Sequence, residues 1–127
     1  MSLALRWLPG RYGVYRLPEG SPLPPWATGG AFTTVSRSGD ELSVLCAWTD
    51  EAAGLPAIGP LVCCRLDGVL DFSLTGVLAR VTAPLATAGI SVFSVATYDT
   101  DYVLVGEAER DRARQALESA GLDFLDD

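Results

Sequence analysis

The chain has 127 residues and a formal net charge of −7 at pH 7, and hydrophobic residues make up 49% of it. This length suits one compact domain or two very small ones. All nine basic residues are arginines and histidine is absent. Histidine bases, imidazole metal ligands, Schiff-base chemistry and the lysine of a P-loop are therefore excluded. The negative charge argues against a nucleic-acid partner, which needs a cationic surface.

Membrane, secretory and metal-site signals are also missing from the sequence. No apolar run approaches the roughly 18 to 20 residues of a membrane span. The N-terminus has no basic region ahead of its short apolar stretch, so we expect a cytoplasmic protein. The cysteines at 46, 63 and 64 fit no CxxC or zinc spacing, and their odd count disfavours a disulfide framework. We interpret them as free buried thiols, and we expect no metal, no cofactor and no membrane partner.

Strand and turn patterns dominate the first half of the chain. Extended segments are predicted at residues 3–8 and 12–17, joined by Pro9-Gly10. The proline-rich residues 21–26 allow at most a short helical turn, because proline withholds a backbone donor. Residues 31–36 and 41–48 are typical of a hairpin around Ser38-Gly39-Asp40. Glycine and proline breaks in residues 49–60 predict a flexible connector, which we take as the domain boundary.

Strands and helices alternate in the second half. Residues 61–66 are predicted as a strand, and residues 74–88 as a helix that ends before Gly89. The further elements, in order, are strands at 90–96 and 102–107, a helix at 109–120 and a short strand at 122–124. The order βαββαβ predicts an α+β, ferredoxin-like unit with an antiparallel sheet and both helices on one face.

A weak internal repeat relates the two halves. Residues 37–45 align without gaps to residues 97–105, and each segment has a turn, an acid (Glu41 or Asp101) and then a strand. Hairpin chemistry alone is one explanation. Together with the βαββαβ order, the repeat favours two related modules, residues 1–58 and 59–127, the first of them degenerate.

Three runs carry a resemblance to a known family: LDFSLTGVLARV (70–81), AGISVFSVATYDTDYVLV (88–105) and, more weakly, SRSGDELSVLC (36–46). In these runs the sequence resembles the ACT-domain family, specifically the tandem-ACT proteins related to the CASTOR arginine sensors. The resemblance implies two ferredoxin-like ACT modules side by side. It also implies a non-enzymatic effector-binding module that holds an amino acid, often at the interface between ACT units.

The start of the helix at 74–88 is the first candidate binding element. Its residues are Leu74, Thr75, Gly76 and Val77, and Thr75 has the side chain of an N-cap. Free backbone N–H groups at a helix start favour an anion such as an α-carboxylate. Gly76 leaves the backbone open to a ligand. The alternative is that Thr75 only caps and Gly76 only packs, since every helix start needs capping.

The acidic turn at residues 97–101 is the second candidate element. Asp99 and Asp101 flank Thr100, and on an extended backbone their carboxylates point to the same side. Such a pair accepts an ammonium or a guanidinium group. Aspartate is also a common turn former. We favour Asp101 as the ligand residue and assign Asp99 to the turn, because the resemblance puts Asp101 at the matching acidic position.

The resemblance adds four residues to the candidate site. It implies that Thr97 and Tyr98 line the pocket, with Tyr98 as an aromatic wall. It also implies that Ser43 and Val44 face the ligand across the interface of the ACT units. Ordinary packing is the alternative for Tyr98 and Val44. Where the arginine sensors carry an acid in the ligand-facing helix, this chain has Ala79-Arg80, so a smaller neutral amino acid fits as well as arginine.

These observations predict a cytoplasmic amino-acid-binding regulatory module that forms a homodimer. The alternative is a structural module that mediates dimerisation or recruits an unidentified protein partner and has no ligand. Exposed sheet edges in ferredoxin-like units make side-by-side pairing feasible. An enzyme is the third class, and it is disfavoured because the acidic turn has no evident nucleophile or metal partner.

Overall fold

The computed structural model describes residues 3–125. The chain divides into two compact units. Unit 1 joins Met1–Leu8 to Val62–Asp127, and unit 2 is Pro9–Leu61. The sequence patterns predict a division between residues 58 and 59, with the first eight residues in the N-terminal module. The outer limits of the predicted modules, residues 1 and 127, lie outside the described residues.

Unit 1 contains a mixed sheet. Its strands are β1 (Ala4–Trp7), the second part of β5 (Ala57–Leu66), β6 (Phe93–Ala96), β7 (Asp101–Gly106) and β8 (Asp123–Phe124). Their order across the sheet is β6-β7-β5-β1-β8. Strand β1 is antiparallel to β5 and parallel to β8. The N-terminal strand therefore lies between the first and the last strand of the predicted βαββαβ segment.

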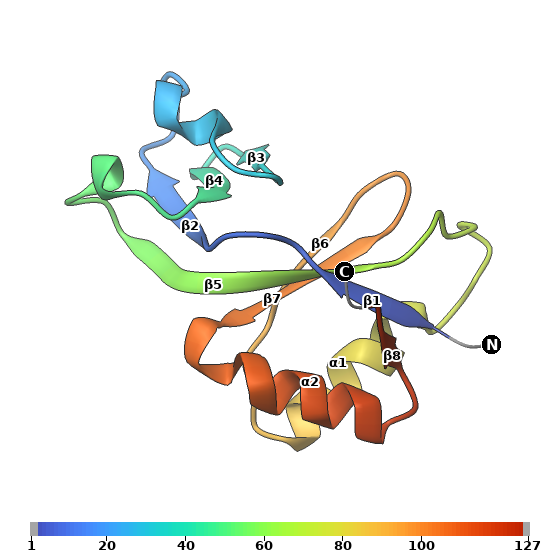
Figure 1. Cartoon of the computed structure of the whole chain (residues 1–127). Coiled ribbons are helices and arrows are strands. Elements are labelled where there is room, and N and C mark those ends of the chain that lie inside the picture. Colours follow the sequence, from blue (N-terminus) through green and yellow to red (C-terminus); the bar gives the residue numbers. More distant parts are fainter. Residues whose placement is uncertain (1–2, 126–127) are drawn as a thin grey trace. The chain divides into compact units, whose positions relative to one another are not determined.

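Two helices cover one face of this sheet, α1 (Val77–Thr87) and α2 (Arg110–Ser119) (Figure 1). Helical spacing places Val77, Val81 and Leu85 on one buried face of α1. They form a core with Leu5 of β1 and Leu117 of α2. Burying each such side chain contributes about 1.5–3 kcal/mol. Unit 1 thus has the α+β architecture that the periodicity predicts.

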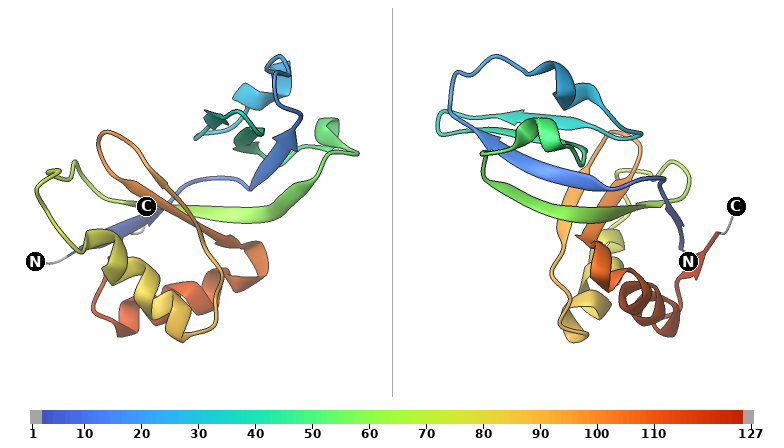
Figure 2. Two further views of the ribbon diagram at one scale, coloured as in Figure 1. Left: turned by 180° about the vertical axis from the view of Figure 1, so that it is seen from behind. Right: turned by 60° about the vertical axis from the view of Figure 1, so that its left-hand side comes forward.

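Unit 2 is built from antiparallel strands. Strands β3 (Thr34–Arg37), β4 (Leu42–Ala47) and β2 (Tyr12–Leu17) lie in the order β3-β4-β2-β5, where β5 contributes its first part. All three pairings are antiparallel. These strands run beside one another in the right-hand view of Figure 2. The strand order and directions are those of a βαββαβ unit.

No α-helix occurs in residues 9–61, all of which the structure describes. Two short 3₁₀ helices, η1 (Pro25–Thr28) and η2 (Asp50–Ala52), occupy the places where a βαββαβ unit has its α-helices. At η1 the prolines of residues 22–25 explain why, since each removes a donor that an α-helix needs. The strand core of this unit includes Tyr15, Leu42 and Val44. The side-by-side arrangement of two modules stays a prediction.

Several predicted elements are confirmed, and others begin or end elsewhere. Strand β2 spans the predicted residues 12–17, and α2 lies within the predicted 109–120. Strand β5 begins at Ala57, inside the predicted connector, because Ala57 and Leu61 pair with Tyr15 and Tyr12. Among the described residues, no helix is long and apolar enough to cross a membrane. A cytoplasmic location stays a prediction.

Candidate functional site

Unit 1 contains a cleft of about 340 Å³. One side comes from the loop that joins β5 to α1, residues 67–76, and from the first turn of α1. The other side comes from the end of β6 and the turn between β6 and β7, residues 97–100. Small-molecule sites typically enclose about 300–1,000 Å³. The cleft is therefore large enough for a small metabolite.

The β5–α1 loop is ordered by its own hydrogen bonds. The Ser73 backbone N–H donates to Oδ1 of Asp71 at 2.9 Å, and the Leu74 N–H donates to the Asp71 carbonyl at 3.0 Å. The bond from the Ser73 backbone, followed by one from its side chain, lowers the pKa of Asp71. The Leu70 N–H donates to the Asp99 carbonyl at 2.7 Å and so joins the loop to the β6–β7 turn.

The side chain of Thr100 holds the β6–β7 turn in place. Its side chain is buried, and its Oγ1 donates to the Leu66 carbonyl at the end of β5, at 2.8 Å. Within the turn, the Thr97 N–H and Oγ1 both donate to the Thr100 carbonyl, at 2.9 and 3.1 Å. These bonds hold the turn next to the β5–α1 loop. The two sides of the cleft are thereby tied together at Leu66 and at Leu70.

Helix α1 begins at the cleft without a side-chain cap. Its N-cap is Gly76, which has the left-handed conformation φ 73°, ψ 7°. A side chain is strained in this conformation, so glycine is favoured there. The prediction that Thr75 caps the helix is wrong, because the left-handed residue moves the helix start to Val77. Within the part of the chain that the structure describes, this N-cap makes no side-chain hydrogen bond to the first-turn N–H groups, which leaves the helix start available to an anion.

The charged side chains that line the cleft are all acidic: Asp71, Asp99 and Asp101. Asp101 is the first residue of β7 and pairs in register with Ala96. Its side chain is partly exposed, and within residues 3–125 no arginine forms an ion pair with it. The carboxylate is free to accept hydrogen bonds from a cationic ligand group.

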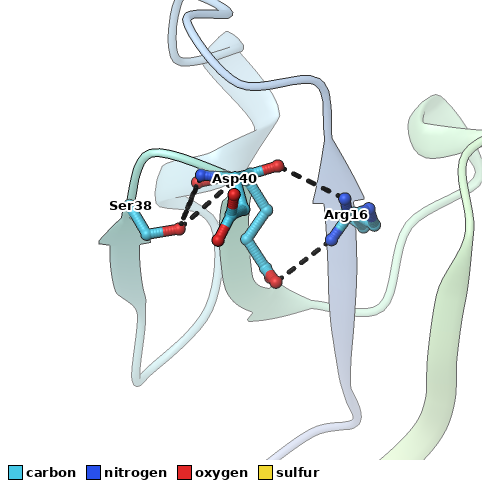
Figure 3. A network of polar contacts seen from close by, with 4 residues as sticks. Arg16, Ser38 and Asp40 are labelled. Carbon is cyan, nitrogen blue, oxygen red and sulfur yellow. Dashed lines mark hydrogen bonds and ion pairs between the residues drawn. The ribbon is translucent and has the colours of Figure 1, made fainter.

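The equivalent acid of unit 2, Glu41, has different surroundings. Arg16 of β2 donates to Oε2 of Glu41 at 3.0 Å and to the Asp40 carbonyl at 3.3 Å (Figure 3). The Ser38 Oγ accepts from the N–H groups of Asp40 and Glu41, both at 3.2 Å. An arginine of its own unit thus neutralises Glu41. The internal repeat therefore places an acid at the same position in both units, but only in unit 1 is its carboxylate free to bind a ligand.

Most of the predicted site residues border this cleft. Those that line it are Leu74, Gly76, Val77, Thr97, Tyr98 and Asp101. Thr75 precedes the helix start and is not among the lining residues. Ser43 and Val44 lie on β4 of unit 2, where Val44 is fully buried in the core and Ser43 pairs with Arg16 and Ser36. Their predicted contact with a ligand stays a prediction.

Several lining residues are not among the predicted site residues: Leu70, Asp71, Phe72, Leu78, Ala96 and Thr100. Asp99 is predicted as a turn residue only, whereas it lines the cleft and its carbonyl accepts from the Leu70 N–H. An Asp-x-Ser sequence after a strand is a signal for the turn at Asp71. No pattern in the sequence identifies Thr100 as buried.

The polar groups of the cleft are carboxylates, hydroxyls and backbone groups. Among the described residues, no group of three or more histidine, cysteine or acidic side chains could hold a metal ion. The thiols Cys63 and Cys64 are buried in β5, and burial raises the pKa of both. Thiols with a raised pKa are poor nucleophiles at neutral pH. The arrangement is suited to binding a small polar molecule.

Family comparisons agree with the division into units. Residues 60–119 match the model of the ACT domain, and residues 10–51 match a separate model described as an N-terminal domain. The protein Atu0741 of Agobacterium tumefaciens is 32% identical, and the match covers 98% of this chain and 93% of that one, with a TM-score of 0.87. No curated protein matches the sequence.

More distant structures share the fold. VC0802 of Vibrio cholerae, a protein of unknown function described as a possible transport protein, is 21% identical with a TM-score of 0.73. The match covers 94% of this chain and 91% of that one. The regulatory subunit of aspartate kinase from Thermus flavus is 14% identical over 94% of this chain and 97% of its own, with a TM-score of 0.62.

Proposed function

Since this chain belongs to the ACT-domain family, we propose that it is a non-enzymatic regulatory module whose cleft in unit 1 binds a free amino acid. One observation carries the proposal. The uncapped start of α1 and the unpaired carboxylate of Asp101 line the same cleft of about 340 Å³. A free amino acid has an anionic and a cationic group on one carbon atom, which matches these two features.

Each end of the cleft provides one type of contact. The N–H groups at the start of α1, beside Gly76, receive the α-carboxylate, and the partial positive charge of the helix start stabilises it. Asp101 receives the ammonium group through charge-assisted hydrogen bonds. Gly76 supports the carboxylate contact, because no atom lies within 4 Å of the position where a Cβ would stand. A role of Ser43 and Val44 as a second wall, and with it a site shared between ACT units, remains part of the sequence prediction.

Thermal unfolding of the full chain with each proteinogenic amino acid tests the proposal. A ligand at one hundred times its Kd stabilises the folded state by about 2.7 kcal/mol. We expect at least one amino acid to raise Tm in a concentration-dependent manner. Asp101→Asn should abolish that rise, because the amide keeps the shape of the side chain but removes its charge.

Glu41→Gln is the matched control. It removes the equivalent acid of unit 2, which is already neutralised by Arg16. This variant should keep the full ligand response. If no amino acid at millimolar concentration raises Tm of the wild-type chain, the proposed function is wrong. If Asp101→Asn and Glu41→Gln respond alike, the assignment of the ammonium site is wrong.

A structural module for dimerisation is the second candidate. Strand β6 supports it, because among the described residues β6 pairs only with β7 and leaves one edge open. Open edges are templates for pairing with another chain. This candidate predicts a stable dimer by light scattering at micromolar concentration and no amino-acid response. The Thr97 N–H faces β7, so along β6 the N–H of Val95 also faces β7 and that of Ser94 faces the open edge. Replacing Ser94 with proline, which removes an edge donor, should then produce monomers.

A further inference from the structure

Two aromatic residues at the cleft are fully exposed. The relative exposure of Phe72 in the β5–α1 loop is 102%, and that of Tyr98 in the β6–β7 turn is 100%. Both line the cleft. Single exposed apolar side chains are common on protein surfaces. Here, however, two of the largest side chains come from the two segments that border one cavity, and neither packs against the core of unit 1.

The remaining lining of the cleft is largely apolar. Leu70, Leu74, Val77, Leu78 and Ala96 contribute to it. Such a lining, with a few polar groups that fix orientation, is typical of a small-molecule site. Asp101 and the start of α1 provide the polar groups. The surface that is left for a ligand side chain is therefore mainly hydrocarbon, with the carboxylates of Asp71 and Asp99 beside it.

The charged residues that line the cleft further restrict the class of ligand side chain. Among the described residues, no arginine lines the cleft, and its acidic residues Asp71, Asp99 and Asp101 repel a second negative charge on a ligand. An ionised side chain, whether acidic or basic, also loses hydration on entering an apolar site. An uncharged side chain avoids both costs, whereas a basic side chain offsets its lost hydration only through attraction to Asp71 and Asp99.

We propose that the cleft takes an amino acid with an apolar side chain, and that Phe72 and Tyr98 contact this side chain and lose their exposure to water when it binds. The inference rests on the proposed function, because it names the class of amino acid for the same site. Phe72 is then a specificity-determining residue. In the free protein, the exposed ring of Phe72 does not pack against the core of unit 1.

The β5–α1 loop provides a matched pair of variants. Phe72 and Val69 belong to the same loop and both are exposed, but only Phe72 lines the cleft. Phe72→Ala should weaken the binding of leucine, measured by titration calorimetry on the full chain, by about ten- to a hundredfold, from the apolar area that is no longer buried. Val69→Ala should change the same Kd by less than about twofold. Neither truncation removes core packing, so both variants should unfold at the wild-type temperature without ligand.

A ligand panel separates this inference from the proposed function. Leucine, isoleucine, methionine and phenylalanine should bind more tightly than glycine, and aspartate and glutamate should not bind. Tighter binding of arginine, lysine or glycine than of leucine would overturn the apolar specificity and leave the proposed function in place. If none of the proteinogenic amino acids binds, both are wrong.

The dimer model gives a different outcome for the same variants. If Phe72→Ala lowers the mass measured by light scattering while the Kd for leucine stays unchanged, the exposed rings are a contact between copies of the chain. That result would overturn the inference. An unchanged mass together with the loss of leucine affinity would support it.

Discussion

Thr100 shows how a single side chain positions both walls of the cleft. Its hydroxyl donates to the Leu66 carbonyl at the end of β5, and its carbonyl accepts two bonds from Thr97. The side chain is only 3% exposed, so the bond to Leu66 has no competition from water. A buried bond of this kind is costly to break, because the partner group is then left without a donor.

We predict that Thr100→Val destabilises the chain by about 1–3 kcal/mol, because it removes the hydroxyl at nearly constant volume. Thr100→Ser keeps the hydroxyl and loses only a methyl group, which costs about 0.8 kcal/mol. Urea unfolding at constant pH measures both values. A valine variant as stable as the serine variant would contradict a role for this hydrogen bond.

The residue scale also shows what a sequence can and cannot predict. Asp101 is predicted because the family resemblance puts it at the matching acidic position, and Gly76 because a residue without a side chain leaves the backbone open to a ligand. Thr75 was misassigned as the N-cap, because threonine is a strong cap by preference. The left-handed conformation at Gly76 that moves the helix start depends on how the β5–α1 loop closes. Such closure depends on tertiary contacts that no local pattern contains.

At the scale of elements, β1 is the strand whose partners the sequence did not predict. Its extended character was predicted, but residues 3–8 were assigned to the N-terminal module. In the structure Leu5 is fully buried and pairs with Leu66 on one side and with Phe124 on the other. Periodicity predicts which face of a strand is buried. It carries no information about which distant strand lies beside it.

We predict that a fragment of residues 59–127, the ACT module as the sequence defines it, does not fold stably. Without β1 it loses the burial of Leu3 and Leu5, about 1.5–3 kcal/mol for each side chain, and β8 loses its partner. Circular dichroism in urea should show a broad, non-cooperative transition. Adding a peptide of residues 1–8 should restore cooperativity, and a fragment as stable as the full chain would contradict this prediction.

At the scale of the whole molecule, the chain contains buried thiols that are protonated at neutral pH. Cys63 and Cys64 are 0% and 2% exposed. Burial raises the pKa of Cys64 from its ordinary value of 9.0 to about 12, and it raises the pKa of Cys63 as well, with a further contribution from Cys64. The folded state therefore retains protons that the unfolded chain releases above about pH 9.

We predict that the free energy of unfolding decreases as pH rises above 9. The unfolded state then binds fewer protons than the folded state, and the slope approaches about 1.4 kcal/mol per pH unit for each thiol. Urea titrations between pH 7 and pH 10 measure it. The variant with both Cys63→Ala and Cys64→Ala should show a shallower slope, although it is less stable at pH 7. An equal slope in both proteins would contradict the prediction.

The position of β1 also affects the order in which the chain becomes structured during synthesis. Unit 2 is complete once residue 61 has been made, and all its strands are then present. Strand β1 is made first. Its neighbour β5 ends at Leu66, just after unit 2, whereas its other neighbour β8 follows only at Asp123–Phe124. Domains generally fold as units as the chain leaves the ribosome. The N-terminal strand therefore has no partner until β5 has been made, and the sheet of unit 1 is complete only after β8 has been translated.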